Sequence, residues 1–218
     1  MYLLDPEWAH LNHGSFGACP RPVLEEYQRL QRELERQPTE FFRGVPDRIA
    51  EARAELAEFV GADAEGLLFM QNVTVGLNAV ARSLRLGPGD EVLATDHQYE
   101  SNNLLWRCLA ERDGFEYVRR PFESPEDFWA GANERTRVLF VSHIASETAR
   151  RFPVEDLCTH ARDAGIVSIV DGAHAPGHVD LDLAAVGADF YAGNCHKWLS
   201  APKGSGRSEE HTSELQSP

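Results

Sequence analysis

The sequence predicts an α/β protein, a three-layer sandwich with a mainly parallel central sheet between two layers of helices. Short apolar segments alternate with helical patterns along the chain, which is the order that a parallel sheet requires. Residues 166–170 are almost wholly apolar, as expected for a strand covered on both faces. Polar side chains follow the ends of several apolar segments, where ligands bind in open α/β sheets.

The individual elements follow from local patterns. Pro20 and Pro22 open a charged helix at 23–36, and a helix at 47–60 ends at Gly61. A strand at 66–70 comes before a helix that Asn72 caps. The remaining elements are expected as strands at 91–94, 115–118, 138–141, 166–170 and 189–192, and helices at 102–111 and 154–164.

Composition indicates a soluble, folded chain. The 218 residues are 42% hydrophobic and 26% charged, far from a disordered composition. The net charge of -14 argues against nucleic-acid binding, which requires a basic surface. The sequence has neither a signal peptide nor a membrane-spanning segment, so we expect a cytoplasmic protein with no membrane partner. Its four cysteines are scattered and are expected to be reduced thiols.

The chain ends in a segment that differs from the rest. Residues 207–218, RSEEHTSELQSP, lose the apolar pattern and read as a translated sequencing-library adapter, whose codons AGA TCG GAA GAG would encode RSEE. A disordered polar terminus is the alternative. We therefore expect an N-terminal segment near the functional site at 1–20, an incomplete large domain at 21–206 and an artefactual tail at 207–218, with a C-terminal small domain missing.

Lys197 follows the last expected strand in AGNCHKWLSAPKG. A cofactor that forms a Schiff base needs an amine that rigid neighbours hold and that can lose its proton in a dry pocket. A lysine in a loop is more often a solvated surface charge. The polar residues that follow the other strands favour the cofactor role.

Asp171 ends the apolar strand at 166–170. Pyridoxal phosphate (PLP) needs an acid beside its ring nitrogen, because the protonated ring withdraws electrons from the substrate Cα. A buried carboxylate is costly unless it is paired, so Asp171 should have a cationic partner. The alternative is a turn residue that caps Gly172.

Other residues could hold the phosphate of such a cofactor. A helix that begins at Val73 or Thr74 offers free backbone N–H groups and the positive end of its dipole. Thr74 adds a hydroxyl, and Asn194 and His196 could complete the site. Simple helix capping by Asn72 and Thr74 is the alternative.

The cofactor ring would need further partners. Tyr99 or His97, in DHQYES, could stack on the ring, and we favour Tyr99. Either aromatic could instead pack against the following helix. Ser146 and His174 are candidates for hydrogen bonds to the phenolic oxygen of the ring, with ordinary loop polarity as the alternative.

Five stretches resemble the class V aminotransferases of PLP fold type I. The likeness is closest to the isopenicillin N epimerase-like branch, which is related to cysteine desulfurases. It is collinear from Leu11 to Gly206, and its most specific part is the Asp171 and Lys197 pair. The stretches are LNHGSFGACP (11–20), NVTVGLN (72–78), DHQYESN (96–102), IVDGAHAPG (169–177) and GNCHKWL (193–199).

The resemblance implies roles for individual residues. Lys197 would hold PLP as an aldimine and Asp171 would pair with the pyridinium nitrogen. The other implied residues are the phosphate ligands Thr74, Asn194 and His196, the stacking residue Tyr99, and Asn12 and His13 near the substrate. The resemblance also implies that residues 21–206 are the PLP-binding large domain and that the full-length protein forms a homodimer.

Two departures and one gap qualify the likeness. Many desulfurases have Gln at the position of His174 and Asn at the position of Ser146, which argues against a desulfurase. The family's carboxylate-binding Arg, and the nucleophilic Cys of a desulfurase, would lie in the missing C-terminal lobe. The resemblance therefore does not choose among transamination, epimerisation and β-elimination.

We therefore expect a PLP-dependent enzyme that acts on an amino acid or a related amine. A substrate amine would displace Lys197 from the cofactor and free it as a general base for the Cα proton. One alternative is a metal-dependent hydrolase with Asp171, His174 and His178 as ligands, although Pro176 opposes the helix that would align the two histidines. Another is a truncated fragment that keeps the fold without activity.

Overall fold

A seven-stranded sheet forms the centre of the protein in a computed structural model, which describes the backbone of residues 1–210 and the side chains of residues 1–206. The order of the strands is β1-β7-β6-β5-β4-β2-β3. Neighbours from β6 to β3 run parallel, and β7 is antiparallel to both of its neighbours. The strands are β1 (Leu67–Met70), β2 (Glu91–Thr95), β3 (Glu116–Arg120), β4 (Thr136–Ser142), β5 (Val167–Gly172), β6 (Phe190–Asn194) and β7 (Gly206–Glu210).

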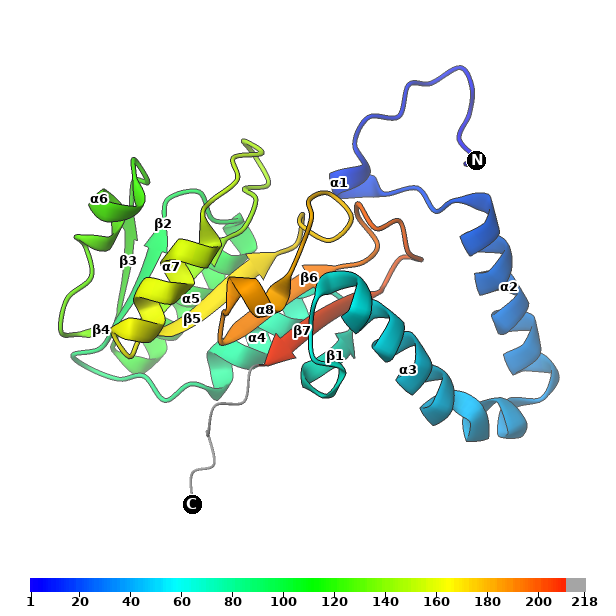
Figure 1. Ribbon diagram of the computed structural model, residues 1–218, viewed down its shortest axis with the longest axis horizontal. Helices are drawn as coiled ribbons and strands as arrows, with labels where there is room; N and C mark the ends of the chain where they lie inside the picture. Colours follow the sequence, from blue (N-terminus) through cyan, green and yellow to red (C-terminus); the bar gives the residue numbers. More distant parts are fainter. Residues whose placement is uncertain (211–218) are drawn as a thin grey trace.

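Helices lie on both faces of this sheet (Figure 1). Buried side chains form two clusters, one on the side of α4 and α5 and the other on the side of α7, α8 and the end of α3. Val92 belongs to the first cluster and its neighbour Leu93 to the second, because successive strand residues point to opposite faces. The helices are α1 (His13–Phe16), α2 (Arg21–Arg36), α3 (Pro38–Val60), α4 (Val73–Ser83), α5 (Glu100–Asp113), α6 (Pro125–Trp129), α7 (Val154–Asp163) and α8 (Leu183–Val186), with a 3₁₀ turn at Ala64–Gly66.

This architecture confirms the predicted three-layer α/β fold, and every expected strand and helix is present. The main differences are at elements without a clear apolar pattern. Helix α3 begins at Pro38, well before the expected start at residue 47, and runs through Pro46. The short helices α6 and α8, capped by the side chains of Ser124 and Asp182, were not expected.

Strand β7 was also not expected. It fills the place between β1 and β6 and includes residues 207–210 of the segment that we set apart as a tail. Strand pairing uses backbone groups, which every residue except proline supplies in full, so an extended segment can pair here whatever its side chains. The rest of that segment, 211–218, lies outside the described residues.

Helices α2 and α3 form a hairpin that projects from the sheet (Figure 1). Helix α2 has no buried residue, and ion pairs of Arg29 with Glu26 and Glu33 lie on its surface. Among the residues that the structure describes, no helix combines the length and the apolar character needed to cross a membrane.

The parallel strands bring several polar residues to one edge of the sheet. Ser142 at the end of β4 is in register with Asp171 of β5, and Gly172 is in register with Gly193 of β6. Because these strands are parallel and adjacent, the residues that follow them gather at the same edge.

Candidate active site

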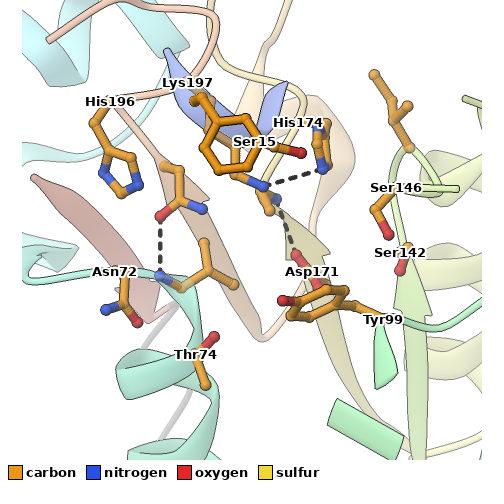
Figure 2. Close-up of a pocket in the computed structure, with 15 residues that line it drawn as sticks. Ser15, Asn72, Thr74, Tyr99, Ser142, Ser146, Asp171, His174, His196 and Lys197 are labelled. Atoms are coloured by element: carbon orange, nitrogen blue, oxygen red, sulfur yellow. Dashed lines mark hydrogen bonds between the residues drawn. The ribbon is translucent and has the colours of Figure 1, made fainter. Parts of the chain in front are cut away.

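A cavity of about 460 Å³ opens at this edge of the sheet (Figure 2). Its wall combines the ends of β4, β5 and β6, the start of α4 and the N-terminal segment. All nine residues expected to bind the cofactor lie on this wall, although they are far apart in the sequence. The lining residues are Ser15, Phe16, Asn72, Val73, Thr74, Tyr99, Ser142, Ile144, Ser146, Asp171, Ala173, His174, Asn194, His196 and Lys197.

The Lys197 amine lies 3.1 Å from Nε2 of His174 (Figure 2). Burial lowers the pKa of Lys197, and the negative charge of Asp171 partly opposes this shift. The loop that carries the lysine is fixed by backbone hydrogen bonds from Ser200 to the Lys197 carbonyl and from Ala201 to the Cys195 carbonyl. Lys197 is therefore a positioned amine that loses its proton more readily than a surface lysine.

Asp171 is only 4% exposed. Its carboxylate accepts hydrogen bonds from Asn102 Nδ2 at 2.6 Å and from the Ala173 amide at 2.9 Å. Burial raises the pKa of Asp171, while the Ala173 amide, the charge of Lys197 and Asn102 oppose the shift. The sequence led us to expect a cationic partner, but the hydrogen-bond partners of Asp171 among the described residues are neutral, and Lys197 acts on it only as a nearby charge.

Sequence reasoning missed Asn102, the side-chain partner of Asp171. The residue is buried near the start of α5, and its Oδ1 has no hydrogen-bond partner among the described residues. Asn102 follows Tyr99 by nearly one helical turn. That spacing was the available signal, but it does not reveal which strand faces this turn of the helix.

The start of α4 forms a site with free backbone donors. The Val73 amide donates to Asn194 Oδ1 at 3.1 Å, and the Val75 amide donates to Asn72 Oδ1 at 3.0 Å. Between them, neither the amide nor the hydroxyl of Thr74 has a partner among the described residues. These donors face the cavity at the positive end of a helix dipole, as an anion requires.

His196 lies on the same side of the cavity (Figure 2). Its Nδ1 is 2.8 Å from the carbonyl oxygen of Ser205, which can only accept a hydrogen bond. The proton of a neutral His196 ring is therefore on Nδ1. Nε2 is then an acceptor in the neutral ring and becomes a donor when the ring is protonated.

Replacing Asn194 by alanine should loosen the start of α4. The substitution leaves the buried Val73 amide without its acceptor, which costs about 1–3 kcal/mol of unfolding free energy. Chemical denaturation would measure this loss. Asn72→Ala is the matched control, because it removes a more exposed cap that should cost about 1 kcal/mol. Equal losses in the two variants would contradict a special role for Asn194.

Tyr99 and His97, the two candidates for stacking, occupy different surroundings. Tyr99 lines the cavity and is 48% exposed. The ring of His97 packs beside Phe152, with a centroid distance of 5.7 Å. The position of Tyr99 therefore favours it over His97. Ser146 also lies on the cavity wall.

The N-terminal segment lies against the loop that carries Lys197. A Cβ on Gly17 would lie 2.4 Å from the carbonyl oxygen of His196, so this close approach requires glycine. Ser15 and Phe16 reach the cavity wall, which the sequence did not predict. Asn12 caps α1, and His13 Nδ1 accepts from the Ala18 amide at 3.4 Å. Their contact with a substrate stays a prediction.

The geometry does not favour a metal site at Asp171, His174 and His178. His174 contacts Lys197 and Trp198, whereas the ring of His178 stacks on Trp198 at 4.4 Å. Within the described part of the chain, no group of three or more His, Cys, Asp or Glu side chains is arranged to hold a metal ion.

Because of His143, we expect the protein to become less stable in acid. The ring is fully buried after β4, and burial lowers the pKa of His143 to about 4. Unfolded histidine titrates near pH 6.5, so the unfolded chain takes up this proton first. The contribution of His143 to the free energy of unfolding is therefore fully present above about pH 6.5. At pH 5 it is smaller by about 2 kcal/mol.

Denaturation of wild type and His143→Gln at pH 7 and pH 5 would test this expectation. The variant should be less stable at pH 7, because it disturbs the 2.9 Å contact of His143 Nδ1 with the Tyr191 hydroxyl. Its further loss between the two pH values should be about 2 kcal/mol smaller than that of wild type. The same loss in both proteins would show that His143 does not titrate as expected.

Comparison with known proteins places this geometry in a family. The family described as aminotransferase class-V matches residues 19–207, most of the chain. The chain belongs to the class V aminotransferase family. This family is PLP-dependent, so the resemblance and the cofactor expected from the sequence are confirmed at the level of the family.

Individual class V relatives span more than one activity. The chain is 42% identical over 215 residues to isopenicillin N epimerase of Streptomyces clavuligerus, covering 94% of the chain and 54% of that protein. It is 31% identical to a probable cysteine desulfurase of Vibrio cholerae, covering 71% of the chain and 40% of the relative. The chain thus spans about half the length of the curated relatives it matches, or less.

A solved structure gives the corresponding comparison of folds. A mutant of the cystine C–S lyase C-DES, with glycine covalently linked to its PLP cofactor, superposes with a TM-score of 0.87 at 24% identity. The match covers 93% of this chain and 56% of that one. The likeness confirms the predicted PLP fold type I architecture.

Proposed function

We propose that this chain binds PLP through Lys197 and that the protein acts at the Cα atom of an amino acid. This proposal rests on one observation: a single cavity holds the positioned amine of Lys197, the buried acid Asp171 and the free hydrogen-bond donors at the start of α4. These are the groups that the aldehyde, the ring nitrogen and the phosphate of PLP require.

The described residues fit this cofactor. The amide and hydroxyl of Thr74 would hold the phosphate, with the Nδ2 amide group of Asn194 beside it, and His196 would donate to it from Nε2 as an imidazolium. Asp171 would keep a proton on the ring nitrogen, and Tyr99 would stack on the ring. His174 and Ser146 would lie near the phenolic oxygen.

Bound PLP supplies an electron sink that stabilises negative charge at the substrate Cα. Lys197 would take the Cα proton, and its lowered pKa favours the neutral form that a base needs. Asp171 contributes by retaining a negative charge opposite the ring nitrogen. Ser15 and Phe16 would limit the access of water to the cavity from the N-terminal side.

Among reactions that begin with loss of the Cα proton, we propose epimerisation of an amino-acid centre. The support is the 42% identity with isopenicillin N epimerase, compared with 31% for the desulfurase relative. Transamination and β-elimination begin in the same way and are the alternative outcomes of the test. His174 and Ser146, which many desulfurases replace, also support a reaction other than desulfuration.

The same proposal covers the rest of the organisation. We propose that residues 1–20 form one side of the active site, which the contact of Gly17 with the lysine loop supports. A cytoplasmic homodimer is proposed for the full-length protein. The exposed α2 helix and the apolar side chains of the N-terminal segment, such as Trp8 and Leu11, would suit a second copy.

Labelling with PLP tests the proposed function directly. The chain is incubated with PLP, reduced with borohydride and digested, and we expect the added mass on the peptide that contains Lys197. Amino acids are then supplied in D₂O, where deuterium at Cα with mixed chirality supports epimerisation. Label on another residue, or no label, would contradict the cofactor assignment. Formation of a keto acid would instead indicate transamination, and release of a β-substituent would indicate β-elimination.

A further inference from the structure

The indole of Trp198, the residue after Lys197, contacts a ring that also contacts the lysine. Trp198 Nε1 is 3.1 Å from His174 Nδ1, and Lys197 Nζ is 3.1 Å from His174 Nε2. Both nitrogens of His174 are therefore engaged, on opposite sides of the ring. Nε2 contacts the amine of Lys197 in the cavity wall, and Nδ1 contacts the indole N–H of Trp198.

These contacts determine where the His174 proton is. An indole nitrogen can only donate, so His174 Nδ1 must accept from Trp198. A neutral imidazole has one proton, which must then be on Nε2. Nε2 can then donate toward Lys197 Nζ, which accepts in its neutral form, and burial favours that form by lowering the pKa of Lys197.

We propose that Trp198 is a positioning residue that holds His174 in the tautomer with its proton on Nε2, so that His174 donates a hydrogen bond into the cavity. This inference rests on the proposed function, because it assigns the acceptor as the anionic phenolic oxygen of PLP. Because Nδ1 accepts from Trp198, Nε2 carries the proton of the neutral ring and acts as the donor.

Trp198 is itself held in place. Its ring stacks on His178 with a centroid distance of 4.4 Å and an interplanar angle of 23°. His178 Nδ1 contacts the backbone carbonyl of His174 at 3.1 Å, which connects the histidines. A Cβ on Gly14 would lie 3.1 Å from Trp198 and 3.2 Å from the His174 ring, so the N-terminal segment packs closely against both rings.

The same contact opposes protonation of His174. An imidazolium would place an N–H on Nδ1 directly opposite the indole N–H, so two donors would face each other. Burial lowers the pKa of His174 to about 4, and a positive charge on Lys197 or His178 would act in the same direction. Trp198 acts in the same direction, and it also determines which nitrogen is protonated in the neutral ring.

Nitrogen-15 NMR of the histidine-labelled chain, without PLP, tests the inference at pH 7. His174→Gln identifies the His174 signals by their loss. We expect Nδ1 to show the shift of an unprotonated nitrogen and Nε2 that of a protonated one. A proton on Nδ1, or an equal mixture of tautomers, would overturn the inference. This measurement needs no variant of Trp198.

Trp198→Phe removes the donor while keeping an aromatic ring. The His174 tautomers should then mix, and the pKa of His174 should rise by about one pH unit. Trp129→Phe is the matched control, because Trp129 packs beside His160 at 5.7 Å and lies outside the cavity wall. It should leave the His174 signals unchanged. An unchanged His174 in Trp198→Phe would overturn the inference.

A double-variant comparison uses the bound cofactor. In the PLP-loaded chain, Trp198→Phe should shift the pH at which the visible absorbance changes to higher values. In the His174→Gln background the same substitution should have no effect, because a Gln amide donates without help from Trp198. An equal shift in both backgrounds would show a merely structural role. The NMR result is independent of PLP, so failure of labelling at Lys197 remains distinguishable from failure of this inference.

Discussion

Replacing Lys197 by alanine should reduce covalent PLP from about one per chain to background. The sequence has two lysines, Lys197 and Lys203, and only Lys197 lines the cavity. Burial lowers the pKa of Lys197, which favours the neutral, nucleophilic amine, whereas Lys203 is exposed to solvent. Intact-mass measurement after borohydride reduction would give the stoichiometry. Any exchange of the substrate Cα proton should fall by about 10²–10⁴-fold with the loss of the base.

Lys203→Ala is the matched control for this experiment. It removes the other lysine and should keep both full labelling and the visible absorbance of bound PLP. Circular dichroism should show that both variants keep the fold, because neither side chain belongs to the buried apolar clusters. Labelling that survives in Lys197→Ala and disappears in Lys203→Ala would reject Lys197 as the site of attachment.

Replacing Asp171 by asparagine should separate folding from chemistry. A neutral amide cannot supply the negative charge that keeps a proton on the cofactor nitrogen, so Cα proton exchange should fall by about 10²–10⁴-fold. Folding should survive, because Asn102 can rotate its amide and offer the unpaired Oδ1 to the new NH₂ group. Since burial raises the pKa of Asp171, removing its charge should preserve or increase stability at neutral pH.

Asp189→Asn provides the comparison for a structural carboxylate. Asp189 Oδ2 accepts from the amide and the hydroxyl of Ser168, before the start of β6 and away from the cavity. This variant should lose stability and retain proton exchange per folded molecule. Asp171 would not be the partner of the ring nitrogen if Asp171→Asn kept its exchange rate, measured by deuterium incorporation under the same conditions.

Much of the fold and the site could be predicted because the signals were local. Strands such as β5 are continuous apolar segments, and the polar residues that follow them must gather at one edge of a parallel sheet. That reasoning placed Lys197, Asp171 and Thr74 together. Their individual roles remain predictions for the experiments above.

The parts that sequence reasoning missed depend on contacts between distant segments. Asn102 meets Asp171 only because α5 begins beside the end of β5, and Ser15 reaches the cavity because Gly17 allows a close approach to His196. Strand β7 lacks an apolar pattern and is defined by backbone pairing with β1 and β6. Neither periodicity nor capping residues carry such information.

The central position of β7 divides the sheet into two parts that depend on it to different degrees. β7 comes after every other described strand in the chain, yet it joins β1 to the rest of the sheet. β1 leads directly into α4, whose start carries the hydrogen-bond donors that could bind an anion. β6 leads into the loop of Lys197. Four of the five residues of β7 belong to the segment that we expect to be an artefactual tail, so the pairing of β1 in this chain depends on that segment. The strands from β2 to β6 pair with one another without β7, so the pairing that brings the ends of β5 and β6 together, next to Asp171 and Lys197, does not depend on it.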